Sequence, residues 1–231
     1  MNGLNITDFH AHILPGADHG SKNIETTKAQ LSLMKDAGVD AVVATPHFYP
    51  QNDSVESFLE RRKASAEALL SIEAESRPQV YLGAEVLVCP GIDHMPGIER
   101  LCIEGTGIML LEMPFSSWSD GHIASVARLA RKGFTVIMAH IDRYPEKDVA
   151  RLVNECDVYY QINGETQSTL KGKMKAGKIM DKLPVAAVGS DIHGTDKTYV
   201  KNFLRLYEKC EKAGFDLSSY AKELLEGAKT I

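Results

Sequence analysis

The chain has 231 residues, of which 44% are hydrophobic and 25% are charged, a balance that excludes disordered and fibrous folds. Its formal net charge of −5, with His taken as neutral, predicts binding neither to nucleic acid nor to an anionic membrane. The four cysteines form no CxxC pair and predict a reducing, cytoplasmic location, and no apolar run approaches the roughly 18 residues of a membrane span.

Short β-branched runs alternate with longer amphipathic stretches, which is the pattern of a βα repeat. In chain order, the first half predicts strand 5–12, helix 25–38, strand 40–47, helix 55–76, strand 79–88, a loop rich in Gly and Pro over 90–97, and strand 107–112. The second half predicts helix 122–132, strand 134–140, helix 149–155, strand 157–163, strand 184–191, and closing helices 201–213 and 220–228. Because no linker interrupts the series, we predict a single α/β domain over residues 1–231 with about seven βα units.

The parallel sheet of such a repeat either closes as a barrel or stays open and doubly wound. A barrel is favoured here, because unusual polar residues follow nearly every strand, whereas an open sheet gathers its ligands at one switch point. We therefore expect a TIM-barrel-like fold in which the carboxyl ends of the strands converge on one mouth.

Histidine and carboxylate side chains end the apolar runs. His10 and His12 lie two residues apart at the end of the first strand and so point the same way from an extended chain. The later strands end with His47, Glu85, Glu112, His140, Asp191 and His193. Each residue alone fits an ordinary role, such as a hydrogen-bonded core histidine or a helix cap. Burying all of them at one mouth without cations would leave several charges unmatched, so together they predict a metal site.

The type of donor narrows the choice of metal. Five imidazoles and three carboxylates without a thiolate favour Mn, Zn or Fe over a soft-ligand metal or Mg. More than four ligands imply two or three ions, about 3.5 to 4 Å apart, an arrangement that clamps a phosphoryl group during in-line attack. Glu85 is the expected bridging carboxylate.

The motifs HxH, TPH, GAE, LLEMP, AHIDRY and SDIH occur in this order, and together they resemble those of the PHP (polymerase and histidinol phosphatase) superfamily. On its opening HxHILP and its HIxRY motif, the chain is most similar to the bacterial manganese-dependent protein-tyrosine phosphatases of capsule and exopolysaccharide synthesis. The resemblance covers the whole chain and implies a distorted (β/α)7 barrel, two or three Mn²⁺ ions, and a phosphotyrosine protein, a bacterial tyrosine kinase, as the partner.

The resemblance also implies a set of metal ligands at the mouth. They are His10, His12, His19, His47, Glu85, Glu112, His140, Asp191 and His193. His19 is the departure in this set, because it stands where the family usually has the second acid of an Asp-Asp-Gly turn. An imidazole can serve as a ligand there; the alternative is that His19 is a solvated loop residue and that Asp18 is the ligand instead.

Arg143 lies three residues beyond His140 and matches the family arginine that grips phosphate. Its planar fork suits that anion. The alternative is a surface salt bridge with Asp142 or Glu146, and the motif favours phosphate binding.

The expected catalytic set is Arg143, Asp191 and His193, with His193 assisting the leaving group. After the SDIH motif the family typically has a loop arginine, and this sequence has Lys197 nearby instead. Lys197 is expected to bind the substrate phosphate as a point charge, without a bidentate fork.

The remaining histidines and aromatic residues carry weaker signals. His94 and His122 are expected to be surface groups. Phe115, Trp118 and Tyr144 follow strand ends, where they could either wall a pocket for an aromatic ring or simply pack.

The expected reaction is hydrolysis of phosphotyrosine by a metal-bridging hydroxide, without a covalent intermediate, since no cysteine has the Cys-x5-Arg spacing. A small-metabolite phosphatase such as a histidinol-phosphate phosphatase stays open, although those enzymes tend to carry longer insertions. An amidohydrolase is less favoured, because Glu112 stands where its carbamylated lysine would be. A non-catalytic binding module is disfavoured by the full ligand set, and the oligomeric state is left open.

Overall fold

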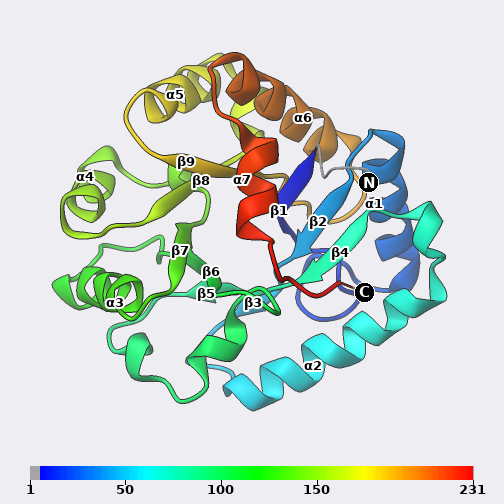
Figure 1. Cartoon of the computed structure of the whole chain (residues 1–231), viewed down its shortest axis with the longest axis horizontal. Coiled ribbons are helices and arrows are strands. Elements are labelled where there is room, and N and C mark those ends of the chain that lie inside the picture. The colour runs from blue at the N-terminus through cyan, green and yellow to red at the C-terminus, as the bar shows by residue number, and fades with distance from the viewer. Residues whose placement is uncertain (1–5, 231) are drawn as a thin grey trace.

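The computed structural model describes residues 6–230, with strands at the centre and helices around them (Figure 1). The strands are β1 (Thr7–Ala11), β2 (Ala41–Ala44), β3 (His47–Phe48), β4 (Gln79–Leu82), β5 (Glu85–Leu87), β6 (Ile108–Glu112), β7 (Thr135–Met138), β8 (Tyr159–Asn163) and β9 (Val185–Gly189). The helices are α1 (Ile24–Asp36), α2 (Val55–Ala68), α3 (Asp120–Arg131), α4 (Glu146–Glu155), α5 (Leu170–Met180), α6 (Lys197–Lys212) and α7 (Leu217–Leu224). Asn5, the first residue of the strand predicted over 5–12, lies outside the described residues.

The strands form two parallel sheets, with the orders β1-β2-β4 and β3-β5-β6-β7-β8-β9. Two backbone hydrogen bonds join β1 to the segment after β9. The Asp191 N–H donates to the His10 carbonyl at 2.8 Å, and the His12 N–H donates to the Ile192 carbonyl at 3.3 Å. The first and last strands therefore lie side by side. The α/β class with parallel strands is confirmed, while closure of the sheets into a barrel and the single-domain assignment stay predictions.

Two strands that we expected to be continuous are interrupted. The range 40–47 splits into β2 and β3, because Pro46 lacks an N–H and cannot join a ladder. The range 79–88 splits into β4 and β5; β4 pairs with β2, whereas β5 pairs with β3. Each break comes directly before a predicted ligand, so His47 and Glu85 begin strands of the second sheet instead of ending strands of the first.

Helix α5 has no counterpart among the predicted helices. Its sequence contains Gly172 and Gly177, which lower helix propensity, and Ala176 and Met180 are its buried residues. The helix begins because the Thr169 side chain accepts a hydrogen bond from the Gly172 N–H at 3.0 Å. With only two buried residues among its lysines, the helix lacks the regular spacing of apolar residues on which the sequence prediction depended.

Helix boundaries differ elsewhere too. The helix predicted over 55–76 ends at Ala68 and continues as short 3-10 turns. The helix predicted over 201–213 begins earlier, at Lys197, because the Asp196 side chain caps it by accepting from the Thr198 N–H. Among the helices of residues 6–230, none combines the length and the apolar character that crossing a bilayer requires.

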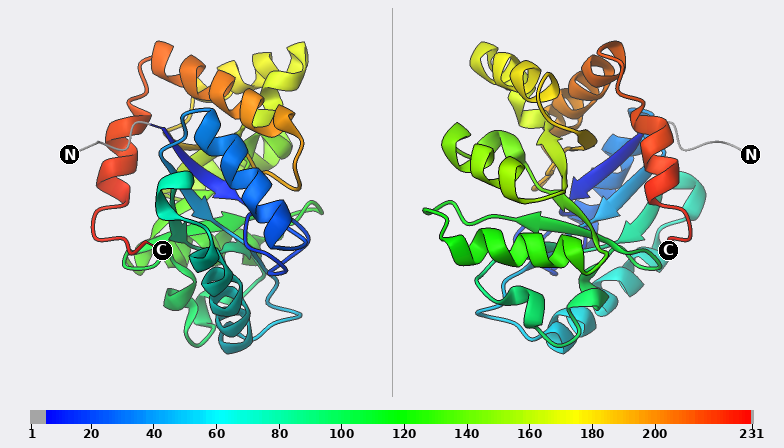
Figure 2. Two further views of the ribbon diagram at one scale, coloured as in Figure 1. Left: turned by 90° about the vertical axis from the view of Figure 1, so that its right-hand side faces the viewer. Right: turned by 60° about the vertical axis from the view of Figure 1, so that its left-hand side comes forward.

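Helix α7 packs across one end of the strands. Ala221 in the helix and Leu225 directly after it join a buried apolar cluster with Phe9, Val43 and Ile137. In Figure 2 this helix lies at the end where β1 begins. The carboxyl ends of the strands therefore face the opposite side of the molecule, where the predicted ligands lie.

An ion pair between a buried aspartate and a partly exposed arginine ties the loop after β5 to α3. Asp93 is 1% exposed and accepts hydrogen bonds from Arg128 Nε at 2.6 Å and Nη2 at 2.9 Å. The Arg128 hydrogen bonds lower the pKa of Asp93 to about 2. Because this pKa lies below its unfolded-state value, the stabilisation is present above about pH 4 and is lost as the pH falls toward 2.

We expect Arg128→Met to lower the free energy of unfolding at pH 7, because the buried Asp93 carboxylate loses the two hydrogen bonds that the guanidinium donates to it. The stability difference from wild type will shrink as the pH falls from 4 to 2. Urea unfolding at several pH values measures both effects, with the exposed Arg131→Met on the same helix as control. An equal loss in both variants would contradict a specific role for the pair.

Candidate metal centre

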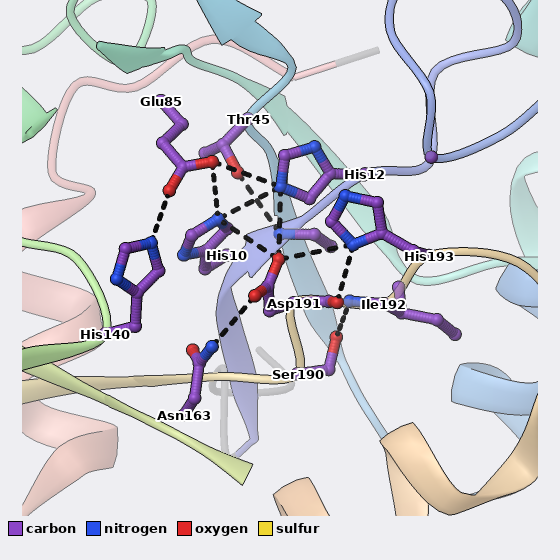
Figure 3. Close-up of polar contacts among 12 residues, drawn as sticks. His10, His12, Thr45, Glu85, His140, Asn163, Ser190, Asp191, Ile192 and His193 are labelled. Carbon is purple, nitrogen blue, oxygen red and sulfur yellow. Dashed lines mark hydrogen bonds and ion pairs between the residues drawn. The ribbon is translucent and has the colours of Figure 1, made fainter. Parts of the chain in front are cut away.

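Glu85 contacts four buried imidazoles, and Figure 3 shows its carboxylate with three of them, those of His10, His12 and His140. Its Oε2 is 3.2 Å from His10 Nε2, 3.3 Å from His12 Nε2 and 2.9 Å from His47 Nδ1. Its Oε1 is 2.8 Å from His140 Nε2. Only 1% of Glu85 is exposed, so one carboxylate meets four imidazoles with almost no contact with bulk water.

Two further carboxylates flank this central glutamate. Asp191 Oδ1 lies 3.3 Å from His12 Nε2 and 3.4 Å from His193 Nδ1. Glu112 Oε1 lies 3.5 Å from His140 Nε2. The structure thus brings together ligands predicted from strands that are far apart in the sequence.

The donor set suits divalent cations. Three groups have ligand atoms within 4.8 Å of one another: His12, His47 and His193; His10, His12 and Glu85; and His47, Glu85 and Glu112. Among the described residues, Glu85 Oε2, His47 Nδ1 and His193 Nε2 are buried without a hydrogen bond of acceptable geometry. Buried polar atoms in native proteins are normally satisfied, and cations would satisfy these.

His19 lies beside two other predicted ligands, His47 and His193. Its ring stacks on that of His47 with centroids 4.9 Å apart, and it is 4.7 Å from the ring of His193. His19 is exposed and is not part of the three compact groups in the described residues. Its role as a ligand stays a prediction that this location supports.

Asp18, the alternative to His19, is engaged in other contacts. Its Oδ2 is 2.6 Å from His12 Nδ1 and accepts the His47 N–H at 3.1 Å, while its Oδ1 accepts the Gly20 N–H at 2.8 Å. A carboxylate on the far nitrogen of a metal-binding imidazole fixes the tautomer and the ring orientation. These contacts let Asp18 orient His12, a role that the sequence did not suggest, while its use as a ligand in place of His19 stays an untested alternative.

Two amide side chains on β8 link ligands from three other strands. Gln161 Oε1 accepts the His140 N–H at 2.6 Å and lies 3.3 Å from His10 Nδ1. Gln161 Nε2 donates to Asn163 Oδ1 at 2.6 Å, and Asn163 Nδ2 donates to Asp191 Oδ2 at 2.9 Å. Sequence reasoning missed this amide chain, although the QxN spacing at a strand end repeats the geometry of the HxH pair.

One close approach and two strained residues accompany this network. A Cβ on Gly189 would lie 2.6 Å from His10 Cβ and 2.7 Å from Gln161 Nε2, so only glycine fits between them. His140 and Asp191 have positive φ values of 32° and 51°. Such left-handed non-glycine residues cost on the order of 1–3 kcal/mol each and are common at functional sites.

We expect Asn163→Ala to weaken Mn²⁺ binding by about 10–100-fold, because Asp191 Oδ2 loses the amide that orients it. Calorimetric titration of chelator-stripped protein with Mn²⁺ measures the affinity, and circular dichroism checks that the fold is retained. The exposed Asn52→Ala is the control. Wild-type affinity in Asn163→Ala would show that the amide chain does not orient the ligands.

The surrounding imidazoles keep Glu85 charged. Burial alone would raise the pKa of Glu85, but the imidazoles around it, His10 foremost, hold it well below its ordinary value. Burial alone would lower the pKa of His140, yet the hydrogen bonds to Glu112 and Glu85 raise it to about 9. Cations binding here would therefore displace protons from imidazoles rather than from acids.

A pocket of about 670 Å³ opens over these ligands, and it brings Arg143 to them. Arg143 Nη2 lies 2.6 Å from Asp191 Oδ2 and 3.2 Å from Glu165 Oε2. These partners replace Asp142 and Glu146, the surface partners considered from sequence. The guanidinium therefore lies at the metal site.

Lys197 is placed less favourably. It is exposed in the first turn of α6 and is not among the described residues that line the pocket. Its phosphate-binding role stays a prediction without support from this geometry. His94 is exposed as expected, whereas His122 is half-buried and caps α3 together with Ser119.

The three aromatic residues near the mouth differ in their roles. Phe115 is 70% exposed, lines the pocket, and has its ring centroid 6.0 Å from that of His140. Trp118 and Tyr144 are buried and pack edge to face at 5.0 Å. Of the three, Phe115 alone offers a free ring face to a ligand, joined in the pocket lining by Tyr49.

The fold and the site define the class: a parallel α/β protein that holds a His and carboxylate cluster for divalent metals beside an arginine. Comparison with protein families then identifies the family to which the chain belongs. The model of the CpsB/CapC family of capsular polysaccharide synthesis matches residues 6–213, and this chain belongs to that family. The resemblance drawn from the motifs is thereby confirmed.

Individual relatives agree with this assignment. The chain is 24% identical over 218 residues to tyrosine-protein phosphatase CpsB of Streptococcus agalactiae, covering 83% of this chain and 84% of that protein. It is 25% identical over 235 aligned positions to the putative tyrosine-protein phosphatase CapC of Staphylococcus aureus, covering 94% and 89%.

Among solved structures, the chain resembles one from a study of Bacillus subtilis YwqE and Streptococcus pneumoniae CpsB, described as metal-dependent tyrosine phosphatases. The TM-score is 0.77 at 19% identity, and the match covers 98% of this chain and 96% of that one. This likeness supports the fold over nearly the full length of both chains.

Proposed function

We propose that this chain is a metal-dependent phosphomonoesterase that hydrolyses phosphotyrosine on proteins. The observation that carries the proposal is the contact of Glu85 with four imidazoles in a pocket that also holds Arg143. The names of the curated relatives, tyrosine-protein phosphatases, support the choice of substrate. We propose two or three Mn²⁺ ions, with Fe or Zn as alternatives.

The strand-end residues would hold the ions. The proposed ligands are His10, His12, His19, His47, Glu85, Glu112, His140, Asp191 and His193. Divalent cations in such a site generate a nucleophile from water near neutral pH and neutralise charge on the phosphoryl oxygens.

Arg143 is the proposed phosphate grip. Its side chain is 31% exposed and lines the pocket, while the buried Asp191 carboxylate holds the guanidinium in place by an ion pair. An incoming phosphate would take the place of Glu165, the more exposed of its two partners. A guanidinium held in this way meets the equatorial phosphoryl oxygens without first having to reorganise.

The leaving group needs little protonation, since the conjugate acid of a phenolate has a pKa of about 10. Burial and the charge of His12 lower the pKa of His193 to about 4, so His193 is neutral at pH 7. A neutral imidazole suits metal coordination better than acid catalysis. We therefore propose that His193 acts first as a ligand.

Phe115 is proposed to contact the aromatic ring of the substrate. We expect Phe115→Ala to raise KM for a phosphotyrosine peptide by about 2–10-fold, because a stacked ring pair contributes about 0.5–1.5 kcal/mol. Steady-state kinetics on the peptide and on a small alkyl phosphate measures the selectivity, with the half-exposed Tyr220→Ala on α7 as control. Equal effects on both substrates would exclude ring recognition by Phe115.

Substrate rates test the proposed function itself. Chelator-stripped enzyme restored with Mn²⁺ is given a phosphotyrosine peptide or histidinol phosphate, with His140→Ala as the inactive control. Preference for the peptide supports the proposal, and preference for histidinol phosphate moves the chain to the metabolite phosphatases. If neither substrate releases phosphate in a metal-dependent way, both phosphatase readings are contradicted, and the amidohydrolase and binding-module alternatives remain. The amidohydrolase is disfavoured because Glu112 stands at the strand end and because no lysine lines the pocket among the described residues.

The partner and the location complete the proposal. We propose a bacterial tyrosine kinase of capsule synthesis as the substrate protein, supported by the description of the family. The four cysteines are free thiols, which supports the predicted cytoplasmic location. A closed (β/α)7 barrel of PHP type is the proposed form of the two sheets, supported by the hydrogen bonds between β1 and the segment after β9.

A further inference from the structure

A groove of about 340 Å³ lies between α4 and α5, separate from the metal pocket. Its floor is apolar and includes Val149, Val153, Ile179 and Leu183. One wall is a row of lysines from α5 and the turn that follows it: Lys175, Lys178 and Lys182. Figure 1 shows the two helices side by side at the edge of the molecule.

The lysines make this region unlike the rest of the chain. Residues 170–182 contain five lysines and one aspartate, in a protein whose net charge is −5. Lys178 and Lys182 are exposed. Within residues 6–230, the lysines found within 4.0 Å of a carboxylate are Lys63 and Lys212. Lys178 and Lys182 therefore have no ion-pair partner at that distance.

Lys175, unlike the other two lysines of the wall, forms a hydrogen bond within the protein. Its Nζ donates a hydrogen bond to the Tyr144 carbonyl at 3.0 Å and so ties α5 to the end of the turn at Ile141–Arg143. The groove therefore keeps its shape by a contact within the protein. Lys178 and Lys182 form no ion pair within 4.0 Å in the described residues, and Glu146 on α4 is the one acidic side chain among the described residues that line the groove with them.

One short segment contributes to both the groove and the metal pocket. Ile141 and Tyr144 line the groove, and in the sequence they lie on either side of Arg143, which lines the metal pocket. Glu165 and Ser168, just before α5, line the metal pocket as well. A polypeptide with its phosphotyrosine beside Arg143 can therefore lay its neighbouring residues along α5.

We propose that this groove docks a segment of the phosphoprotein substrate that carries both acidic and apolar side chains next to the phosphotyrosine. Charge complementarity selects acidic residues for the lysine wall, and the apolar floor selects Leu-like or Val-like side chains between them. This inference rests on the proposed function and specifies its substrate class. An anionic membrane is the competing occupant, but a flat surface does not fill a groove between two helices.

The test uses the double variant Lys178→Glu/Lys182→Glu, which leaves Lys175 and the metal ligands intact. Three substrates are compared: a phosphotyrosine peptide flanked by Asp, Glu and Leu, the same peptide flanked by Ser and Lys, and p-nitrophenyl phosphate. The matched control is Lys35→Glu/Lys222→Glu, which makes the same charge change at exposed positions on α1 and α7.

We expect the groove variant to raise KM for the acidic peptide by about 10-fold at low ionic strength, with kcat on p-nitrophenyl phosphate unchanged. The wild-type preference for the acidic peptide will weaken with added salt. The same KM in both double variants, or no wild-type preference for the acidic peptide, would overturn the inference.

Two further measurements separate the remaining outcomes. Fluorescence anisotropy of the unphosphorylated acidic peptide reports docking without catalysis, so the inference is tested even if no substrate is hydrolysed and the proposed function fails. Co-sedimentation with vesicles of anionic phospholipid tests the membrane. Loss of vesicle binding in the groove variant with unchanged peptide affinity would replace the peptide with a lipid surface and overturn the inference.

Discussion

Glu85→Gln will lower kcat/KM for a phosphotyrosine peptide by at least about 10³-fold and will reduce the number of Mn²⁺ ions bound. The reason is the position of Glu85 at the centre of four imidazoles, with both carboxylate oxygens in use. The amide retains the volume but loses the negative charge, and its NH₂ group would face imidazole nitrogens or cations. Neither Asp191 nor Glu112 is placed to contact all four rings.

Metal content per chain after reconstitution and dialysis, together with initial rates, measures this effect. The exposed Glu99→Gln is the matched control for the loss of one carboxylate. Thermal unfolding without metal checks that both variants are folded. Full metal content with full activity in Glu85→Gln would exclude a bridging role for this residue.

Arg143→Lys will lower kcat/KM for the phosphotyrosine peptide by about 10²-fold while Mn²⁺ affinity stays near that of wild type. Lysine keeps the charge but cannot present two parallel N–H groups to a phosphate while also contacting Asp191. The expected loss therefore reports on phosphate recognition rather than on net charge. We expect kcat/KM to be lower still in Arg143→Ala, because this substitution also removes the positive charge.

The contact at 2.6 Å between Arg143 and Asp191 makes a second measurement necessary. Titration of each variant with Mn²⁺ separates a direct role from an effect transmitted through the ligand. A parallel fall in metal affinity and activity would assign Arg143 to positioning Asp191, and it would remove Arg143 from the proposed phosphate site. Inorganic phosphate as a competitive inhibitor gives an independent check, because its inhibition constant should rise in Arg143→Lys.

Predictions from local patterns were accurate where one short segment contains all the necessary information. All seven predicted strand ranges contain strands, because alternating β-branched runs bounded by polar residues are a local signal. The pairing of His10 with His12 followed from the period of two in an extended chain. Convergence of the strand ends followed from parallel strands sharing one direction.

Predictions failed where distant segments decide the local structure. Helix α5 was missed, because its lysines and glycines conceal a helix that packs with only a few buried residues. The breaks before His47 and Glu85 were missed, because each depends on which sheet the next strand joins.

The sequence by itself determined the class of the protein and the set of candidate ligands, because residue type and strand spacing are properties of the chain alone. Only the tertiary structure decided how those ligands are held. Asp18 orients His12, and Gln161 and Asn163 join ligands from other strands, through hydrogen bonds between residues up to 151 positions apart. Likewise the groove beside α5 exists only because the fold brings α4 next to it, since a groove needs two surfaces and neither sequence segment forms it alone.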